Sequence, residues 1–396
     1  MTFEMLEVEN QGAVIKVIGV GGAGGNAVAH MISRNVQGVD FICANTDAQA
    51  LSRSKAEGLI QLGRTGLGAG AKPEAGRLAA EEARERIAES LEGAHMVFIT
   101  AGMGGGTGTG AAPVVAAVAK EKGILTVGVV SKPFGFEGTK KMRVAEEGLD
   151  QLSNYVDSLI IVLNEKLEEV MGEDAEMDAC FKTADDVLHN AVAGIAEIIK
   201  VDGLINVDFE DVKTVMSEQG KAMMGTAMAA GTDRARIAAE QAVTSPLLEG
   251  VDLSGARGVL VNITASHSLK LKETKIVMET IRAFAAEDAT VIFGAVYDDT
   301  MADNLRVTVV ATGLGRTKQR PMLVPTPVMQ PMHRTGTHDA IGIASGTTSA
   351  HVNYGDLDRP AVWRNSRESA AARVSALEES GMDRLEIPAF LRKQAD

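Results

Sequence analysis

Short apolar runs alternate with helical patterns through the first half of the chain. The runs at 13–18, 39–44, 96–100, 124–130 and 159–163 have the length and composition of buried β-strands. The intervening segments predict right-handed β–α–β units and a parallel sheet. The clearest helical pattern runs from Met177 to Lys200, where apolar residues recur every three or four positions. This order predicts an α/β domain followed by one long helix.

The pattern changes after this long helix. Strands are predicted at 222–229, 258–265, 290–297 and 305–312, with helices at 233–244 and 269–285, which indicates a smaller α/β domain with a mixed sheet. Periodicity vanishes from Thr317 to about Gly381, and six of the 10 prolines lie beyond residue 320. We therefore expect a disordered linker there. The apolar and basic segment that follows it is typical of a peptide that binds other proteins.

Three glycine-rich stretches lie next to the predicted elements. The first glycine loop is Gly19 to Asn26, which satisfies G-x-G-x-x-G before a helix expected from about Ala27. The second is Gly63 to Gly76, and the third is Gly104 to Gly110, between the strand at 96–100 and a helix expected at 114–120. Glycines let the backbone approach an anion, and helix N-termini favour negative charge. Because the loops fall at the carboxyl edge of the sheet, they predict a phosphate site.

Composition narrows the function classes. A net charge of −14 disfavours general nucleic-acid binding. The part before Thr317 carries a net charge of −15, because the remainder has 10 basic and 9 acidic side chains and so is +1. Cys43 and Cys180 have no neighbouring Cys/His cluster, so we expect no disulfide framework, no zinc site and a reducing cytoplasm. The sequence also predicts neither a transmembrane helix nor a signal peptide.

Two other classes of protein share part of this pattern. The first glycine loop, with Asp47 at the end of the next strand, fits an NAD-binding oxidoreductase in which the acid binds ribose. That interpretation leaves the other two loops unexplained, and His95 and His189 are isolated in the sequence. The chain has no G-x-x-x-x-G-K-[ST] motif, which disfavours a P-loop enzyme. A scaffold that binds a nucleotide without turnover is the second alternative.

The third glycine loop, GGGTGTG, resembles the signature loop of the tubulin/FtsZ family of GTPases. The similarity runs in order from about Val14 to Gly315 and returns at the extreme C-terminus. It implies a GTP-hydrolysing cytoskeletal protein that polymerises head to tail into filaments of the bacterial division ring. The implied α/β fold has an N-terminal extension (1–12), a Rossmann-like parallel-sheet GTPase domain (13–173), a central helix (174–201), a smaller mixed-sheet α/β domain (202–316), a disordered linker (317–381) and a partner-binding peptide (382–396).

The resemblance also implies a set of nucleotide contacts. Residues expected against the phosphates are Gly22, Ala23, Gly24, Gly25, Asn26, Gly104, Gly105, Gly106, Thr107, Gly108, Thr109 and Gly110. Glu137 resembles the family's ribose-binding acid. Asn164 and Asp185 resemble its guanine readers, with Phe181 stacking on the base. A carboxylate can accept from both N1–H and N2–H₂ of guanine, a donor pair that adenine lacks.

Two positions depart from the family pattern. Lys141 stands where the family usually has an arginine four residues after the ribose acid, so the charge is kept but the bidentate fork is lost. Arg143, two residues further on, is an alternative source of that fork. Lys72 stands where the family commonly has asparagine before proline, and it either contacts the γ-phosphate region or decorates the surface.

Asn206, Asp208 and Asp211 carry the chemistry that the resemblance implies. In the family this loop enters the nucleotide site of the next subunit, where carboxylates orient the attacking water while Mg²⁺ spans the phosphates. No side-chain ligand for Mg²⁺ is predicted. The spacing alone favours a simpler role, because Asp208 followed by Asp211 before a helix is also a helix N-cap with an acid at its third position.

The C-terminal segment resembles the family's binding site for membrane-tethering division proteins of the FtsA and ZipA kinds. The residues that carry this similarity are Asp383, Leu385, Ile387, Pro388, Phe390 and Leu391. The resemblance implies a cytoplasmic homopolymer at mid-cell, held at the inner face of the membrane through these partners. Neither direct membrane insertion nor nucleic-acid binding is expected.

Overall fold

The computed structural model of this chain describes residues 12–172, 175–201, 203–205, 207–218, 220–245, 255–286 and 288–314. All of them belong to one compact unit, which extends from Met1 to Met322. The expected linker, the C-terminal peptide and Asn206 lie outside the described residues.

Ten strands form one continuous sheet. They are β1 Ile15–Val20, β2 Val39–Asn45, β3 Gly58–Gln61, β4 Met96–Gly102, β5 Leu125–Lys132, β6 Ser158–Leu163, β7 Gly220–Ala230, β8 Gly258–Ala265, β9 Thr290–Tyr297 and β10 Asn304–Leu314. Their order in the sheet is β3-β2-β1-β4-β5-β6-β7-β10-β8-β9. The pairs from β3 to β7 are parallel, β10 is antiparallel to both β7 and β8, and β8 and β9 are parallel. The predicted α/β class with a parallel and a mixed part is confirmed.

The strand order reverses between β1 and β4. Because β2 and β3 follow on one side of β1 while β4, β5 and β6 follow on the other, the connections leave in opposite directions at this point. In open parallel sheets, ligands bind beyond the carboxyl ends of the strands at such a reversal. The first glycine loop follows β1 and the third follows β4, so the reversal sets two of the three loops side by side.

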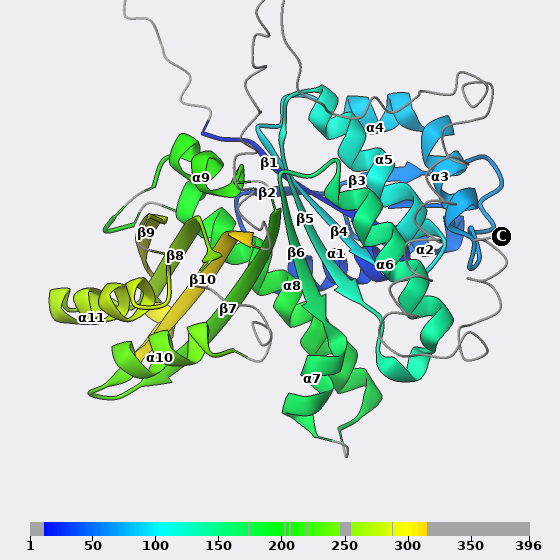
Figure 1. Ribbon diagram of the computed structural model, residues 1–396. Coiled ribbons are helices and arrows are strands. Elements are labelled where there is room, and N and C mark those ends of the chain that lie inside the picture. The colour runs from blue at the N-terminus through cyan, green and yellow to red at the C-terminus, as the bar shows by residue number, and fades with distance from the viewer. Residues whose placement is uncertain are drawn as a thin grey trace, which may run out of the picture. The chain divides into compact units, whose positions relative to one another are not determined.

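Helices cover both faces of the sheet (Figure 1). α1 Gly21–Ser33, α8 Met177–Lys200 and α9 Phe209–Met216 pack on one face, in a core that β1, β4, β5 and β6 also share. The other face carries α3 Pro73–Glu82, α4 Arg84–Ser90, α5 Thr107–Glu121 and α6 Thr139–Ser153, and, over the last strands, α10 Arg234–Val243 and α11 Leu271–Arg282. Short elements complete the chain: α2 Ala48–Ser52, η1 Gly135–Glu137, α7 Asn164–Met171 and η4 Asp299–Met301.

The long helix α8 has the bounds that the apolar pattern predicts. Its apolar stripe, which includes Leu188, Val192 and Ile195, is buried against the sheet. It contacts β5 and β6 in the parallel part of the sheet, and also β8 and β9 in the mixed part that follows β7. Burying a large aliphatic side chain contributes ~1.5–3 kcal/mol. The stripe therefore stabilises both halves of the sheet with a single helix.

Two helices begin earlier than the sequence predicts. α1 starts at Gly21 and α5 at Thr107, inside the first and third glycine loops, whereas the expected helix starts were about Ala27 and Val114. Glycine has a low intrinsic helix propensity, which is why the sequence placed these residues in loops. Packing of the loops against one another outweighs that local preference. The strand β3 was also not predicted.

A buried arginine links elements of the part of the sheet that carries α10 and α11. Arg234 is 5% exposed, and its Nε and Nη2 donate to the two carboxylate oxygens of Glu273 at 2.7 and 3.2 Å. Its Nη1 donates to the carbonyl oxygen of Asp303 at 2.8 Å. These bonds join the starts of α10, α11 and β10. Arg234 lowers the pKa of Glu273 through this hydrogen bond.

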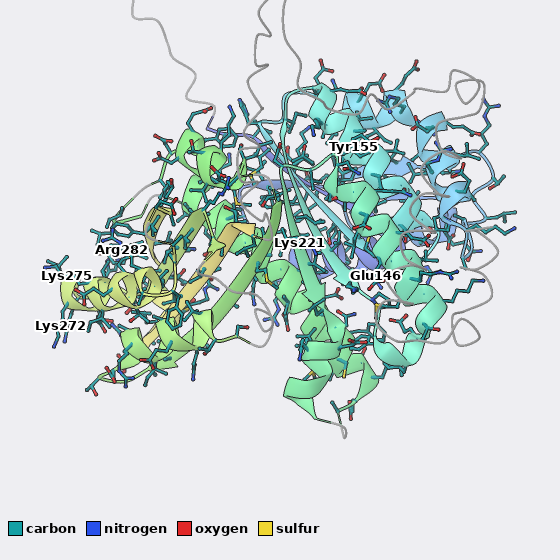
Figure 2. All side chains as sticks on the ribbon, viewed as in Figure 1. Glu146, Tyr155, Lys221, Lys272, Lys275 and Arg282 are labelled. Carbon is teal, nitrogen blue, oxygen red and sulfur yellow. The ribbon has the colours of Figure 1, made fainter. Side chains whose placement is uncertain are left out.

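The exposed side of α11 is basic. Lys272, Lys275 and Arg282 extend from this helix away from the sheet (Figure 2). The opposite side of the helix buries Val277 and Ile281. Among the residues that the structure describes, no helix combines the length and apolar character needed to cross a membrane.

Candidate nucleotide-binding site

The three glycine loops interlock at the carboxyl edge of the sheet. A Cβ on Gly21 of the first loop would lie 2.9 Å from the backbone nitrogen of Gly108 in the third. A Cβ on Gly106 would lie 2.2 Å from the carbonyl oxygen of Gly70 in the second, and one on Gly110 would lie 1.9 Å from that of Pro73. These separations are too short for any side chain. The glycines therefore let three backbone segments meet in one place.

Other glycines of the same loops face open space. A Cβ on Gly22, Gly25 or Gly105 would meet no atom within 4 Å. α1 and α5 begin here, and neither has an N-cap side chain that hydrogen-bonds to its first-turn amides. Helix N-termini carry free N–H groups and a favourable field for anions. This combination of room and donors fits the phosphate chain of a nucleotide.

The two threonines of the third loop hold the loops together. Thr109 is 2% exposed, and its Oγ1 accepts the N–H of Gly104 at 2.8 Å. Thr107 Oγ1 lies 2.6 Å from Thr46 Oγ1, at the end of β2. The Gly104 amide is thus hydrogen-bonded within the protein, while the resemblance implies that Gly104 lies against the phosphates. Thr46 was not among the predicted site residues, although it lies in the polar Asn-Thr-Asp segment that ends a buried strand.

Asp47 has a local structural role. Its side chain accepts from the backbone N–H groups of Gln49 at 2.8 Å and Ala50 at 3.4 Å and so caps α2. The oxidoreductase alternative had assigned this acid to a ribose. An N-cap explains its position at the start of a helix.

The expected ribose acid, Glu137, is held by two partners. Its Oε1 accepts the backbone N–H of Phe134 at 2.9 Å, and its Oε2 forms an ion pair with Lys141. Lys141 also packs over the third loop, because a Cβ on Gly104 would lie 2.7 Å from Lys141 Cγ. Arg143 instead extends to Glu147 and is well exposed, so it does not replace Lys141 beside Glu137. Lys141 therefore links the acid to the phosphate loop.

The predicted base readers lie along β6, α7 and α8. Asn164 begins α7 directly after β6 and is 5% exposed, and its buried Oδ1 has no hydrogen-bond partner among the residues that the structure describes. A buried acceptor without a partner is costly, and a ligand donor would satisfy it. On α8, burial raises the pKa of Asp185 to about 6. Such a carboxylate is ionised above this pH and can then accept two hydrogen bonds.

Three phenylalanines form an aromatic group at this end of the site. Phe134 is buried, and Phe181 meets it edge-to-face with ring centroids 5.2 Å apart. Phe136 stacks on Phe134 at the same centroid distance and is 61% exposed. The predicted stacking residue Phe181 is thus supported by a buried ring while part of it stays accessible. Phe136 was not predicted, because a single exposed aromatic residue in a loop gives no pattern.

Asp208 and Asp211 lie at the other edge of the sheet. Asp208 is the N-cap of α9, and its Oδ1 accepts the Asp211 backbone N–H at 2.8 Å, as the capping interpretation expected. The next residue, Phe209, contacts His95, which precedes the first residue of β4. Figure 1 places α9 and α7 at opposite ends of the parallel strands. Since β4 has 7 residues that rise ~3.3 Å each, about 20 Å separates these acids from the glycine loops.

Lys72 is exposed at the N-cap position of α3. Its side chain makes no capping hydrogen bond there. The position agrees with a surface residue next to the second glycine loop.

Comparison with known proteins gives matches over most of the chain. The family model described as "Tubulin/FtsZ family, GTPase domain" matches residues 14–172, and that described as "FtsZ family, C-terminal domain" matches residues 220–315. The chain is 57% identical to the cell division protein FtsZ of Pseudomonas aeruginosa and 55% identical to that of Azotobacter vinelandii, with 100% of each chain covered.

Solved structures give the same result. The FtsZ dimer of M. jannaschii is 41% identical, with a TM-score of 0.74, and the alignment covers 81% of this chain and 96% of that one. CetZ2 of Haloferax volcanii, solved as a GTPγS-bound protofilament, is 22% identical with a TM-score of 0.64, covering 77% of this chain and 94% of that one, which supports the fold alone. These matches give no support to the oxidoreductase alternative.

Proposed function

This chain belongs to the tubulin/FtsZ family of GTPases, and from that membership we propose that its hydrolytic centre forms only between two copies that meet head to tail. The chain is a cell-division GTPase that binds GTP and GDP with Mg²⁺ and converts GTP to GDP and phosphate. The proposal concerns which residues do this and where they meet.

The separation of the two candidate residue sets carries the proposal. The glycine loops lie at the carboxyl edge of the strands, and Asp208 and Asp211 lie at the opposite edge, about 20 Å away. One copy therefore cannot bring its own carboxylates to its own bound phosphates. Copies can stack so that the strand ends near Asp208 and Asp211 of one copy meet the glycine loops of the next. Each such contact then completes one site. The CetZ2 protein of Haloferax volcanii was itself solved as a protofilament.

Each group has a defined task in this centre. The backbone N–H groups around Gly22, Gly25 and Gly105 bind the phosphates, and the N-termini of α1 and α5 stabilise the charge that develops on them. When bound with the nucleotide, Mg²⁺ would further neutralise the phosphate charge. Asp208 and Asp211 of the adjoining copy accept hydrogen bonds from the attacking water and orient it towards the γ-phosphate. By the family resemblance we assign Asn206 a role in the same catalytic centre.

The other end of the nucleotide is held by the remaining predicted residues. Glu137, supported by Lys141, accepts hydrogen bonds from the ribose hydroxyls. Asn164 and Asp185 bind the guanine edge, and Phe181 covers its face. We retain the proposed boundaries of a GTP-binding domain at 13–173, a central helix at 174–201 and an assembly domain at 202–316.

A mixing experiment tests the two-copy site. Asp211→Ala keeps the glycine loops intact, and Gly105→Ala keeps Asp208 and Asp211 intact. Each variant alone is expected to hydrolyse GTP slowly. In a mixture, the glycine loops of the first meet the carboxylates of the second, so activity should exceed the sum of the separate rates. Glu210→Ala is the matched control, because Glu210 is an exposed neighbour that pairs with Lys213, and it should retain activity.

A strictly additive mixture would contradict the proposal, provided that sedimentation shows that the two variants copolymerise. A second measurement is the GTPase rate per subunit against protein concentration, together with the pelleted fraction. We expect a threshold concentration below which hydrolysis is negligible. Constant specific activity without a GTP-dependent pellet would mean that each copy holds a complete site.

The C-terminal peptide is proposed to attach such filaments to the membrane. Residues 382–396, with Asp383, Leu385, Ile387, Pro388, Phe390 and Leu391, would bind tethering proteins of the FtsA and ZipA kinds at the cytoplasmic face of the division site. Many weak contacts along one filament give a large avidity. Deleting Asp383 to Asp396 should leave the GTPase rate unchanged and abolish recruitment to vesicles that carry the tether. Recruitment of the truncated chain would contradict this assignment.

A further inference from the structure

A cluster of ionisable side chains joins α1 to α8 next to the proposed guanine readers. We call it the α1–α8 cluster, and it consists of His30, Arg34, Asp185, Asp186 and His189. Asp186 Oδ1 accepts hydrogen bonds from His30 Nε2 at 2.8 Å and from Arg34 Nη2 at 2.9 Å. The His30 and His189 rings meet edge-to-face with centroids 6.2 Å apart. One carboxylate oxygen thus ties two helices together.

Asp185 differs from its neighbour. Within the described part of the chain, Asp185 has no hydrogen bond or ion pair, whereas Asp186 has two. The pKa of Asp185 is raised to about 6, mainly by burial, while His30 lowers it and the charge of Asp186 raises it. An adjacent carboxylate without compensation would raise this pKa more, because like charges at short range disfavour ionisation. The partners of Asp186 supply that compensation.

We propose that Arg34, by pairing with Asp186, and His30, by donating a hydrogen bond to it, keep Asp185 ionised and therefore able to accept hydrogen bonds from both donors of guanine. This inference rests on the proposed function, in which Asp185 binds the base. His30, Arg34 and Asp186 are positioning residues in this scheme, since they act through Asp185. Arg34 is the C-cap of α1 and His30 lies in its last turn, where the helix dipole favours cations.

The same contacts join the two ends of the nucleotide site. α1 begins at Gly21 in the first glycine loop and ends beside Asp186. α8 carries Asp185 and Phe181. A single rigid helix therefore connects the phosphate end to the base end, and the Asp186 contacts fix its position relative to α8.

Other charged groups also lie near this part of α8. α7 also packs on α8 and carries Glu165 and Lys166 in its first turn, and β5 ends at Lys132, which pairs with Glu146. On α8 itself, Lys182 pairs with Asp178. The charged groups that act on Asp185 are His30 and Asp186. Arg34 reaches Asp185 through its bond to Asp186.

Binding of GDP between pH 5 and pH 8 tests the inference. The experiment uses the full chain at low ionic strength, at concentrations below assembly, and compares the wild type with Arg34→Gln and Asp186→Asn. Arg34→Gln should move the midpoint of the pH dependence upwards by about half a unit to one unit, which weakens binding about two- to fivefold at pH 6. Asp186→Asn should move it downwards, because it removes the neighbouring negative charge that raises the pKa of Asp185.

Opposite shifts are the decisive result, since loss of structure would not move the two variants in opposite directions. No shift in either variant, or shifts in the same direction, would overturn the inference. Arg34→Lys retains the charge and should restore the wild-type midpoint. The phosphates of GDP titrate in every sample, so their contribution cancels in the comparison between variants.

Asp185→Asn separates this inference from the proposed function. It should remove the part of the pH dependence that belongs to Asp185 and reduce the preference for GDP over ADP. If this variant binds GDP as the wild type does, the proposed role of Asp185 fails. If it binds poorly while Arg34→Gln and Asp186→Asn leave the midpoint unchanged, the role of Asp185 stands and only the α1–α8 inference fails.

Discussion

Replacing Gly105 with alanine should separate nucleotide binding from folding. Gly105 lies in the turn before α5, and a Cβ there would meet no protein atom within 4 Å. The apo protein should therefore fold as before, with its free energy of unfolding changed by no more than ~0.5 kcal/mol. The same open space is where we place the phosphates.

The expected loss of affinity follows from hydrogen-bond geometry. A phosphate oxygen bound by an N–H group of this turn lies ~2.9 Å from the nitrogen, so a new methyl group on the same residue competes for its position. Losing one hydrogen bond to a charged oxygen costs ~1.5–3 kcal/mol. This corresponds to a roughly 10- to 100-fold higher dissociation constant for GDP. Isothermal titration calorimetry with GDP and thermal unfolding without nucleotide measure the two effects separately.

Gly110→Ala is the matched control in the same loop. Its Cβ would lie 1.9 Å from the carbonyl oxygen of Pro73 and 2.7 Å from the backbone nitrogen of Arg77. Relieving the first contact requires a displacement of ~1 Å between α3 and α5, and overpacking of this kind costs ~1–3 kcal/mol. This variant should lose stability as well as affinity. If Gly105→Ala binds GDP within twofold of the wild type, the phosphates do not lie over this turn and the site assignment is wrong.

Three further predictions concern single contacts. Asp208→Ser should keep the N-cap of α9 and lose most GTPase activity, measured as phosphate release in sedimenting polymer, whereas a purely capping role would leave activity intact. Lys141→Met should weaken GDP binding about tenfold, because it frees the Glu137 carboxylate from its ion pair. Lys141→Arg should retain binding. Equal GDP affinities in the two variants would exclude a role for the ion pair. Arg234→Ala should destabilise the chain by up to ~3–5 kcal/mol in chemical unfolding, because it leaves the Glu273 carboxylate, whose side chain is only 14% exposed, without its charged partner. Arg234 lowers the pKa of Glu273. The stability that this pair contributes is therefore present at a pH above the usual pKa range of glutamate, and it is lost as the pH falls through the lowered pKa of Glu273. Glu273→Gln should accordingly reduce the loss of unfolding free energy at acid pH.

The local apolar pattern determined most of the elements. The bounds of α8, β8 and β9 agree with the prediction, because each has a regular apolar stripe or a run of apolar residues in its own sequence. The three glycine loops and their place at the carboxyl ends of the strands followed from the same pattern. The sequence was less informative where a local preference and a tertiary contact disagree. The early starts of α1 and α5 are the example, since glycine disfavours helix unless neighbouring loops hold it there.

Only the tertiary structure decided which distant residues meet. The ion pair of Lys141 with Glu137 and the contact of Lys141 with Gly104 depend on how α6 lies against the third loop. The burial of the Asn164 oxygen, the contacts of Asp186 with α1 and the burial of Arg234 also depend on how distant elements pack together. The separation of Asp208 from the glycine loops depends on strand direction across the whole sheet. Periodicity reports which face of an element is buried, whereas these facts depend on the packing of elements far apart in the chain.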